Sequence, residues 1–149
     1  MNMAIDIYQS VFENLSFGVA IIDNSNRIVE SNNLFNIYFK YNPKPKPLKL
    51  DHLHSSFENV SISSFKQKTK LTLADKKVLS IQASPLKDDL WLIEVLDISL
   101  EERESEDIYI QVNYDKLTHL PNRQLFNDRC KQALSARHRH KENLALFFI

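Results

Sequence analysis

Glycine and cysteine are nearly absent from this sequence. Of its 149 residues, only Gly18 is a glycine and only Cys130 is a cysteine. A phosphate-binding loop of the P-loop or Rossmann kind needs several glycines at fixed spacings, so nucleotide binding by either kind of loop is excluded. A single cysteine cannot form an intrachain disulfide, which fits a reducing compartment.

Long apolar runs and net charge are lacking as well. No run approaches the roughly 20 apolar residues that span a bilayer. Residues 1–6 have neither the basic stretch nor the long apolar stretch of a secretory signal. Lys and Arg number 19, as do Asp and Glu, so no net field favours nucleic acid or an anionic membrane. We therefore expect a cytoplasmic protein with no nucleic-acid partner and no membrane insertion in this segment.

The composition itself is that of an ordinary soluble protein. Hydrophobic residues make up 43% and charged residues 26% of the chain, which is enough to build a packed core. The length suits one domain, or one small domain and part of another.

Residues 1–16 predict an amphipathic helix. Ile5, Tyr8, Phe12 and Leu15 recur at spacings of three, four and three, which places them on one face. Such a face either packs on its own domain or forms the seam of a dimer, and the stretch is too short to decide between them.

Residues 17–99 predict an α+β domain with a five-stranded antiparallel sheet and helices on one face. Alternating or β-branched segments indicate the strands, and the nearly continuous apolar run at 90–96 indicates a central strand covered on both faces. A helix begins near Asn33 and must end at the alternating prolines of 43–47, and a short helix follows at 50–57. The expected strands are 18–23, 27–30, 68–73, 79–84 and 90–96.

A ligand pocket in this domain would lie between the helices and the inner face of the sheet. The same apolar residues could equally fill a dry core, and we favour the filled core because so many aromatic residues fall in a small domain. The candidate lining residues are Phe35, Tyr38, Phe39, Leu53, Phe57, Leu71 and Ile81.

Residues 100–114 predict a connecting helix, and a new unit follows. Acidic residues crowd the start of this segment, as suits the first turns of a helix. Asn122 after Pro121 is a good N-cap for a second helix. The apolar run at 144–149 is typical of a buried central strand, so we expect a domain that is cut off there.

This second unit resembles the beginning of a GGDEF domain, the diguanylate cyclase fold. The family opens with D-x-L-T-G-L-P-N-R, and here only the glycine differs, with His119 in its place. The resemblance implies that residues 115–149 supply a helix and the first strand, and that the matched residues are structural. The matching residues are Asp115, Leu117, Thr118, Leu120, Pro121, Asn122 and Arg123.

Residues 17–99 resemble a PAS domain, a sensory module. Gly18 precedes the first strand and Asn32 follows the second, as in the family's opening pattern. Residues 97–99 resemble the D-I-T that closes many PAS domains before a signalling helix. The combined resemblance implies a bacterial cyclic-di-GMP signalling protein, in which a homodimeric PAS module controls a diguanylate cyclase domain through residues 100–114. The alternative is an inert ligand-binding or dimerisation module on a degenerate GGDEF domain, with or without a following EAL domain.

No catalytic residue, metal site or cofactor is expected in this chain. The family's metal-binding, guanine-binding and GGDEF-loop residues come after its first strand, so GTP and Mg²⁺ are expected only in a longer parent protein. A flavin adduct needs a cysteine within the PAS domain, and Cys130 lies outside it. His52 and His54 lie where some PAS domains place a haem ligand, and we interpret them instead as polar residues of a short helix. A small-molecule ligand of unidentified chemistry stays open.

Overall fold

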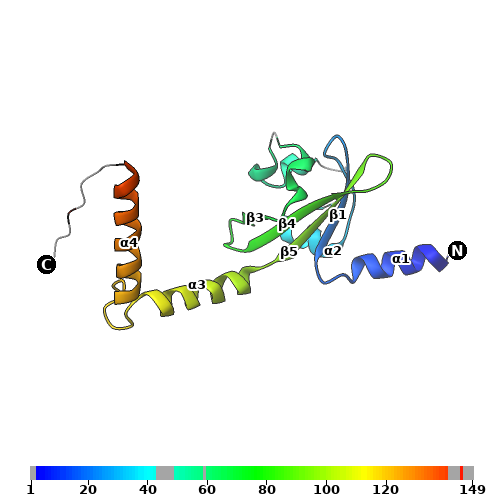
Figure 1. Cartoon of the computed structure of the whole chain (residues 1–149). Coiled ribbons are helices and arrows are strands. Elements are labelled where there is room, and N and C mark those ends of the chain that lie inside the picture. Colours follow the sequence, from blue (N-terminus) through cyan, green and yellow to red (C-terminus); the bar gives the residue numbers. More distant parts are fainter. Residues whose placement is uncertain (1–2, 43–48, 59, 141–144, 146–149) are drawn as a thin grey trace. The chain divides into compact units, whose positions relative to one another are not determined.

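The structure is a computed structural model that describes residues 3–42, 49–58, 60–140 and residue 145. The chain divides into two compact units, Met1–Leu100 and Glu101–Ile149, which are described separately (Figure 1). Within the described ranges, every helix is too short or too polar to cross a bilayer.

The first unit is built on one sheet of five antiparallel strands, which confirms the predicted α+β class. The strand order is β2-β1-β5-β4-β3, so β5 lies in the centre between β1 and β4, as its apolar run predicted. The prediction that both faces of β5 are covered is wrong. Ile93 and Val95 are buried on the inner face, but Leu96 on the outer face is 46% exposed. The strands are β1 (Gly18–Asp23), β2 (Ile28–Ser31), β3 (Thr69–Thr72), β4 (Val78–Pro85) and β5 (Leu90–Asp97).

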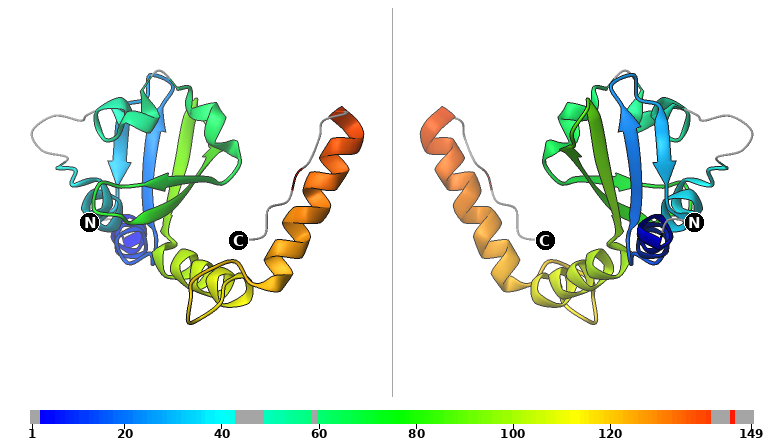
Figure 2. Two further views of the ribbon diagram at one scale, coloured as in Figure 1. Left: turned by 90° about the vertical axis from the view of Figure 1, so that its left-hand side faces the viewer. Right: turned by 90° about the vertical axis from the view of Figure 1, so that its right-hand side faces the viewer.

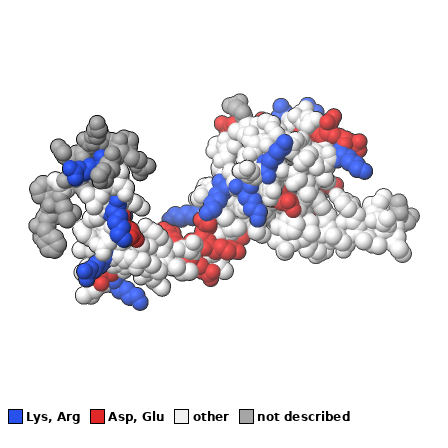
Figure 3. Space-filling view, viewed as in Figure 1, with Lys and Arg blue, Asp and Glu red and all other residues white. Residues whose placement is uncertain are grey.

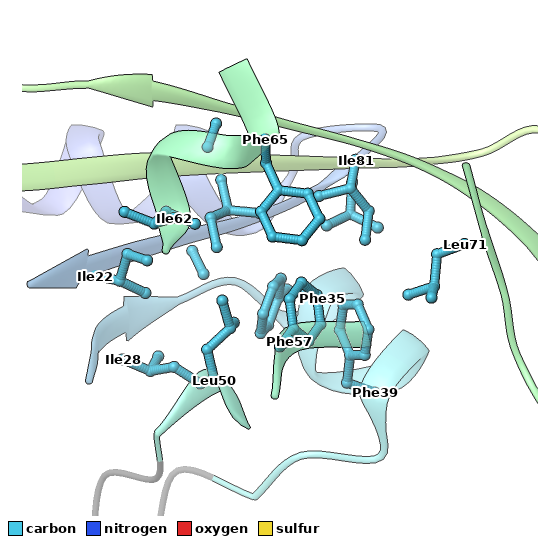
Figure 4. Packing of buried hydrophobic residues seen from close by; sticks show 14 of the residues in the cluster. Ile22, Ile28, Phe35, Phe39, Leu50, Phe57, Ile62, Phe65, Leu71 and Ile81 are labelled. Atoms are coloured by element: carbon cyan, nitrogen blue, oxygen red, sulfur yellow. The ribbon is translucent and has the colours of Figure 1, made fainter. Parts of the chain in front are cut away.

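A helix and three short 3-10 helices lie over the inner face (Figure 2), and their apolar side chains pack in the core (Figure 4). Helix α2 ends before the prolines, because Lys40 adopts a left-handed conformation, with φ 51°, and donates its backbone N–H to the carbonyls of Asn36 and Ile37. The prolines of 43–47 lie outside the described residues. These elements are α2 (Asn33–Phe39), η1 (Leu50–His52), η2 (Ser55–Phe57) and η3 (Ile62–Lys66), so the short helix expected at 50–57 is two 3-10 turns.

Aromatic rings form the centre of the core between the sheet and these helices. Phe35 and Phe39 lie 4.9 Å apart between ring centroids, Phe39 and Phe57 5.8 Å, and Phe57 and Phe65 5.4 Å (Figure 4). Tilted and edge-on pairs at such distances stabilise a core beyond the area that they bury. Leu50 packs in the same cluster. The four rings therefore join α2, η2 and η3 into one layer.

The N-terminal helix α1 (Met3–Glu13) packs on the first unit by one face only. Phe12 is buried, Tyr8 stacks on it at 5.6 Å, and the Tyr8 hydroxyl donates to Glu30 over 3.2 Å. Of the two interpretations of this face, packing on its own domain therefore holds at Phe12. A second stripe was not predicted: Ile7 and Val11 lie one turn apart and are 57% and 59% exposed.

The second unit contains two helices joined by a turn. They are α3 (Ser99–Asn113), which starts at the end of the first unit, and α4 (Arg123–His140). Acidic side chains gather along α3 (Figure 3), with Glu101 and Glu102 in its first turn, where they complement the helix dipole. The strand expected at 144–149 lies outside the described residues, apart from Ala145.

Gly18 is required because α2 lies so close to β1. A Cβ atom at this position would lie 3.0 Å from the Cα of Phe35 and 3.2 Å from the Tyr38 ring. We expect Gly18→Ala to lower the free energy of unfolding in urea by about 1–3 kcal/mol, since the backbone of α2 must move away. Ser25→Ala, in an exposed turn, is the matched control. If Gly18→Ala is as stable as this control, α2 can move away from β1 without a loss in the free energy of unfolding.

Candidate functional site

Asn32, at the end of β2, is the buried polar centre of the first unit. Its side chain is fully buried, and its Oδ1 accepts the N–H of Val19 at 2.9 Å and the N–H of Phe35 at 3.0 Å. Its Nδ2 donates to the carbonyls of Phe12 at 3.2 Å and Phe17 at 3.0 Å. One amide thus caps α2 and ties the end of α1 to β1. The resemblance pointed to this asparagine, but not to its four partners.

The seven candidate pocket residues lie together, and most of them fill the core. Five are buried there, while Tyr38 and Leu53 are half-buried and pack against the others. A cavity of about 150 Å³ remains open at one edge of this cluster. Its lining includes three of the seven, Tyr38, Phe39 and Leu53. The sequence analysis did not assign the other lining residues to a site; they are Lys40, His54, Leu73, Ala74 and Asp75.

His54 and His52 do not form part of a metal cluster in the described part of the chain, where no group of three or more His, Cys, Asp or Glu side chains could hold an ion. The Nδ1 atom of His54 accepts the N–H of Ser56 at 3.1 Å. This bond caps η2, so His54 has a structural role at the rim of the cavity.

Asp97 and Ser99 anchor the start of α3 to β4. The Oδ1 atom of Asp97 accepts the Ser99 hydroxyl at 2.6 Å and the Ser99 N–H at 3.0 Å. The same hydroxyl accepts the N–H of Val78 at 2.9 Å, and the carbonyl of Val78 accepts the N–H of Ile98, also at 2.9 Å. The two side chains and the backbone groups of Val78, Ile98 and Ser99, called the Asp97–Ser99 anchor below, fix the point where the sheet ends and the helix begins.

Tyr38 lines the cavity and is half-buried. Burial raises the pKa of its hydroxyl, and the negative charge of Asp97 raises that pKa further. The ammonium of Lys77 lies 5.8 Å from the centroid of the Tyr38 ring, within the range of a cation–π interaction. Tyr38 therefore lines the cavity in a partly buried position near charged side chains.

In the second unit, Asp115 organises the turn between α3 and α4. Its Oδ1 atom accepts the N–H of Thr118 at 2.9 Å, the Thr118 hydroxyl at 2.8 Å and the N–H of Leu117 at 3.2 Å. The bonds from Thr118 hold the pKa of the Asp115 carboxyl below its ordinary value. This explains why the motif pairs an aspartate with a threonine three residues later.

Asn122 joins the two helices of the second unit. Its Oδ1 accepts the N–H of Leu125 at 3.0 Å and caps α4, as predicted. Its Nδ2 donates to the carbonyl of Val112 at 2.7 Å, and its N–H donates to the carbonyl of Asn113 at 2.8 Å. The side chain therefore caps the end of α3 as well as the start of α4. Sequence reasoning missed the bond to α3.

Other residues of the motif point outward. Leu117 is 89% exposed and Leu120 is 63% exposed, and Arg123 is also exposed. His119 takes the position of the family's glycine with φ 55°, in the left-handed region that favours glycine. The turn conformation thus accounts for the glycine that the motif usually carries.

Replacing His119 tests this backbone requirement. We expect His119→Gly to slow amide exchange at Asn122, because the left-handed conformation costs a residue with a Cβ about 1–2 kcal/mol. His119→Ala is the matched control, since it removes the imidazole but keeps the Cβ. Equal exchange rates in the glycine and alanine variants would show that the backbone is not strained.

The carboxyl of Asp115 should titrate below its ordinary range. A lowered folded-state pKa stabilises the turn above the unfolded pKa, and this contribution is lost as the pH falls through the folded value. We expect carbon-detected NMR to show Thr118→Ala raising the Asp115 pKa toward normal, whereas Thr118→Ser leaves it low. An unchanged Asp115 pKa in Thr118→Ala would contradict the role given to the hydroxyl.

Comparison with known protein families supports the resemblance of the second unit to a GGDEF domain. Residues 112–149 match the model of the family described as Diguanylate cyclase, GGDEF domain, which is less than half of this chain. This part of the chain is therefore a partial GGDEF domain, as its opening motif predicted. No curated protein matches the chain.

Solved PAS domains resemble the first unit at low sequence identity. The PAS domain of an HTR-like protein from Haloarcula marismortui is 15% identical, with 64% of this chain and 93% of that chain covered and a TM-score of 0.42. The PAS domain of nitrogen regulation protein NR(II) from Vibrio parahaemolyticus is 14% identical, with 62% and 98% covered and a TM-score of 0.42. By its own five-stranded antiparallel sheet, covered by helices on one face, the first unit is PAS-like.

Proposed function

We propose that this chain is the regulatory part of a bacterial cyclic-di-GMP signalling protein, in which the PAS-like unit controls a diguanylate cyclase domain through α3. The observation that carries this proposal is that side chains hold both ends of α3. The Asp97–Ser99 anchor holds its start, and Asn122 bonds to the carbonyl of Val112 at its end. A helix held at both ends can pass a change in the sheet to the GGDEF opening.

We assign catalysis to residues outside the described part of the chain. The matched segment includes the Asp115 turn and the cap of α4, whose side chains position helices, and its described residues form no metal-binding cluster. We assign GTP and Mg²⁺ to a complete GGDEF domain in a longer protein, where divalent metal would neutralise charge during phosphoryl transfer.

Changing the length of α3 tests the control that we propose. In a protein with this chain and a complete GGDEF domain, two residues inserted after Ser105 rotate the end of the helix by about 200°, whereas seven add about two whole turns. We expect the two-residue insertion to lower cyclase activity at least about tenfold and the seven-residue insertion to restore most of it. Equal activity in both proteins would exclude control through helix phase, and no activity in any of them would favour a degenerate GGDEF domain.

We also propose that the chain acts as a homodimer, with α1 and α3 at the interface. On α1, Met3, Ile7 and Val11 recur every four residues and are 77%, 57% and 59% exposed. On α3, Ile108 and Val112 are 61% and 50% exposed at the same spacing. Exposed apolar stripes of this kind are typical of helices that pair.

A charge placed in the α1 stripe tests the dimer. We expect Ile7→Glu to convert the sedimenting species from dimer to monomer, because the carboxylate would be buried without a partner. Gln9→Glu, an exposed position about 160° around the same helix from Ile7, is the matched control and should remain dimeric. An Ile7→Glu protein that sediments as a dimer would place the interface elsewhere.

A further inference from the structure

A separate cavity, called the Tyr109 cavity below, lies at the end of α3 within the second unit. Its volume is about 390 Å³, more than the roughly 150 Å³ that holds a benzene molecule. Residues of α3 and of the turn after it form the lining, which consists of Glu106, Tyr109, Ile110, Tyr114 and His119. The space therefore accommodates a small organic molecule.

Two tyrosine rings form adjoining walls of the Tyr109 cavity. The ring centroids of Tyr109 and Tyr114 lie 6.3 Å apart and the ring planes are inclined by 63°, so the rings form a corner rather than a stack. The N–H of Tyr114 donates to the carbonyl of Ile110 at 2.9 Å, which fixes the second ring beside the helix. The face of an aromatic ring carries partial negative charge and attracts a cation. Such a corner therefore suits a cation with an apolar shell.

The charges around the Tyr109 cavity also favour a cation. Helix α3 carries five acidic residues and one basic residue, Arg103, and its acidic side chains gather along it (Figure 3). Glu106 is the carboxylate in the lining, whereas Arg103 and Lys116 are not part of it. His119 is the one lining residue that can become positive, and the Asp115 carboxylate of the same turn opposes that charge. Negative charge therefore prevails at this site.

The Tyr109 cavity and the exposed stripe of Ile108 and Val112 occupy different faces of α3. Glu106 and Ile110 each lie two residues from Ile108, which places them about 160° away from it around the helix. A dimer that pairs through the stripe therefore does not require the residues of the cavity.

We propose that the Tyr109 cavity binds a small, free organic cation that carries a quaternary ammonium group. Tyr109 and Tyr114 supply the aromatic walls, and Glu106 supplies the opposite charge. A quaternary ammonium has no N–H to satisfy, so its methyl groups can contact the rings and Ile110 without loss of hydrogen bonds. This binding site goes beyond the proposed control through α3 and does not depend on it.

Titration of the whole ¹⁵N-labelled chain with choline chloride tests the site, at an ionic strength held constant with sodium chloride. We expect saturable shifts of the Ile110, Tyr114 and His119 amide resonances, with a Kd on the order of 10 mM for so small a ligand in an open site. The neutral isostere 3,3-dimethylbutan-1-ol has carbon in place of the nitrogen, so it should give no saturable shift.

Substitutions on α3 separate the contribution of the ring from that of the charge. Tyr109→Leu should weaken choline about fivefold, whereas Tyr109→Phe keeps the ring and should bind within about 1.5-fold of the wild type. Glu106→Gln should weaken choline about threefold. Glu104→Gln makes the same charge change about 160° around the helix from Glu106 and is the matched control, with an expected change within about 1.5-fold.

A trimethyllysine derivative distinguishes a free cation from a modified protein side chain. We expect Nα-acetyl-Nε-trimethyllysine amide to bind within about threefold of choline, and binding at least about tenfold tighter would overturn the assignment to a free cation. Absent shifts, or equal shifts with the neutral isostere, would overturn the site. Equal choline affinity in Tyr109→Leu and Tyr109→Phe, or in Glu106→Gln and Glu104→Gln, would overturn the roles given to the ring and the carboxylate.

Discussion

The first unit depends on one buried amide, that of Asn32. Its four hydrogen bonds reach the end of α1, the loop before β1, β1 itself and the first turn of α2. A buried donor or acceptor left without its partner costs about 1–3 kcal/mol. All four partners are backbone groups, and Asn32 is the buried polar side chain among the described residues that joins them.

The position of the cavity beside Tyr38 follows from this arrangement. Asn32 starts α2 against β1, where only a glycine at position 18 allows the close approach of Phe35. From this start, the single helix of seven residues brings Phe35 and Phe39 into the aromatic core and ends with Tyr38 at its edge. The cavity therefore lies where α2 ends.

Much of this fold could be predicted from the sequence. Alternation in 68–73 and 79–84 placed β3 and β4, and it also assigned Leu71 and Ile81 to the inner face, where both are buried. Alternation could not say whether space remains beside them, since a cavity depends on packing among residues from separate segments. The left-handed conformation of Lys40, which ends α2 early, carries no reliable signal in a lysine.

The second unit shows the same division between local and distant contacts. The cap of α4 by Asn122 could be predicted from the sequence, because a cap joins residues three apart. The bond from the same side chain back to Val112 spans ten residues and needs the geometry of the whole turn. The sequence showed that His119 replaces the glycine of the motif. Only the structure, in which His119 has a φ of 55°, shows that this position adopts a conformation that favours glycine.

Equilibrium unfolding of Asn32→Ala in urea, beside Asn33→Ala at the exposed neighbouring position, tests the central claim most directly. Removing the Asn32 amide leaves two carbonyls and two N–H groups without partners. The account predicts a loss of about 2–5 kcal/mol in the free energy of unfolding for Asn32→Ala, and a change within about 0.5 kcal/mol for Asn33→Ala. Equal stability of the two variants would contradict it.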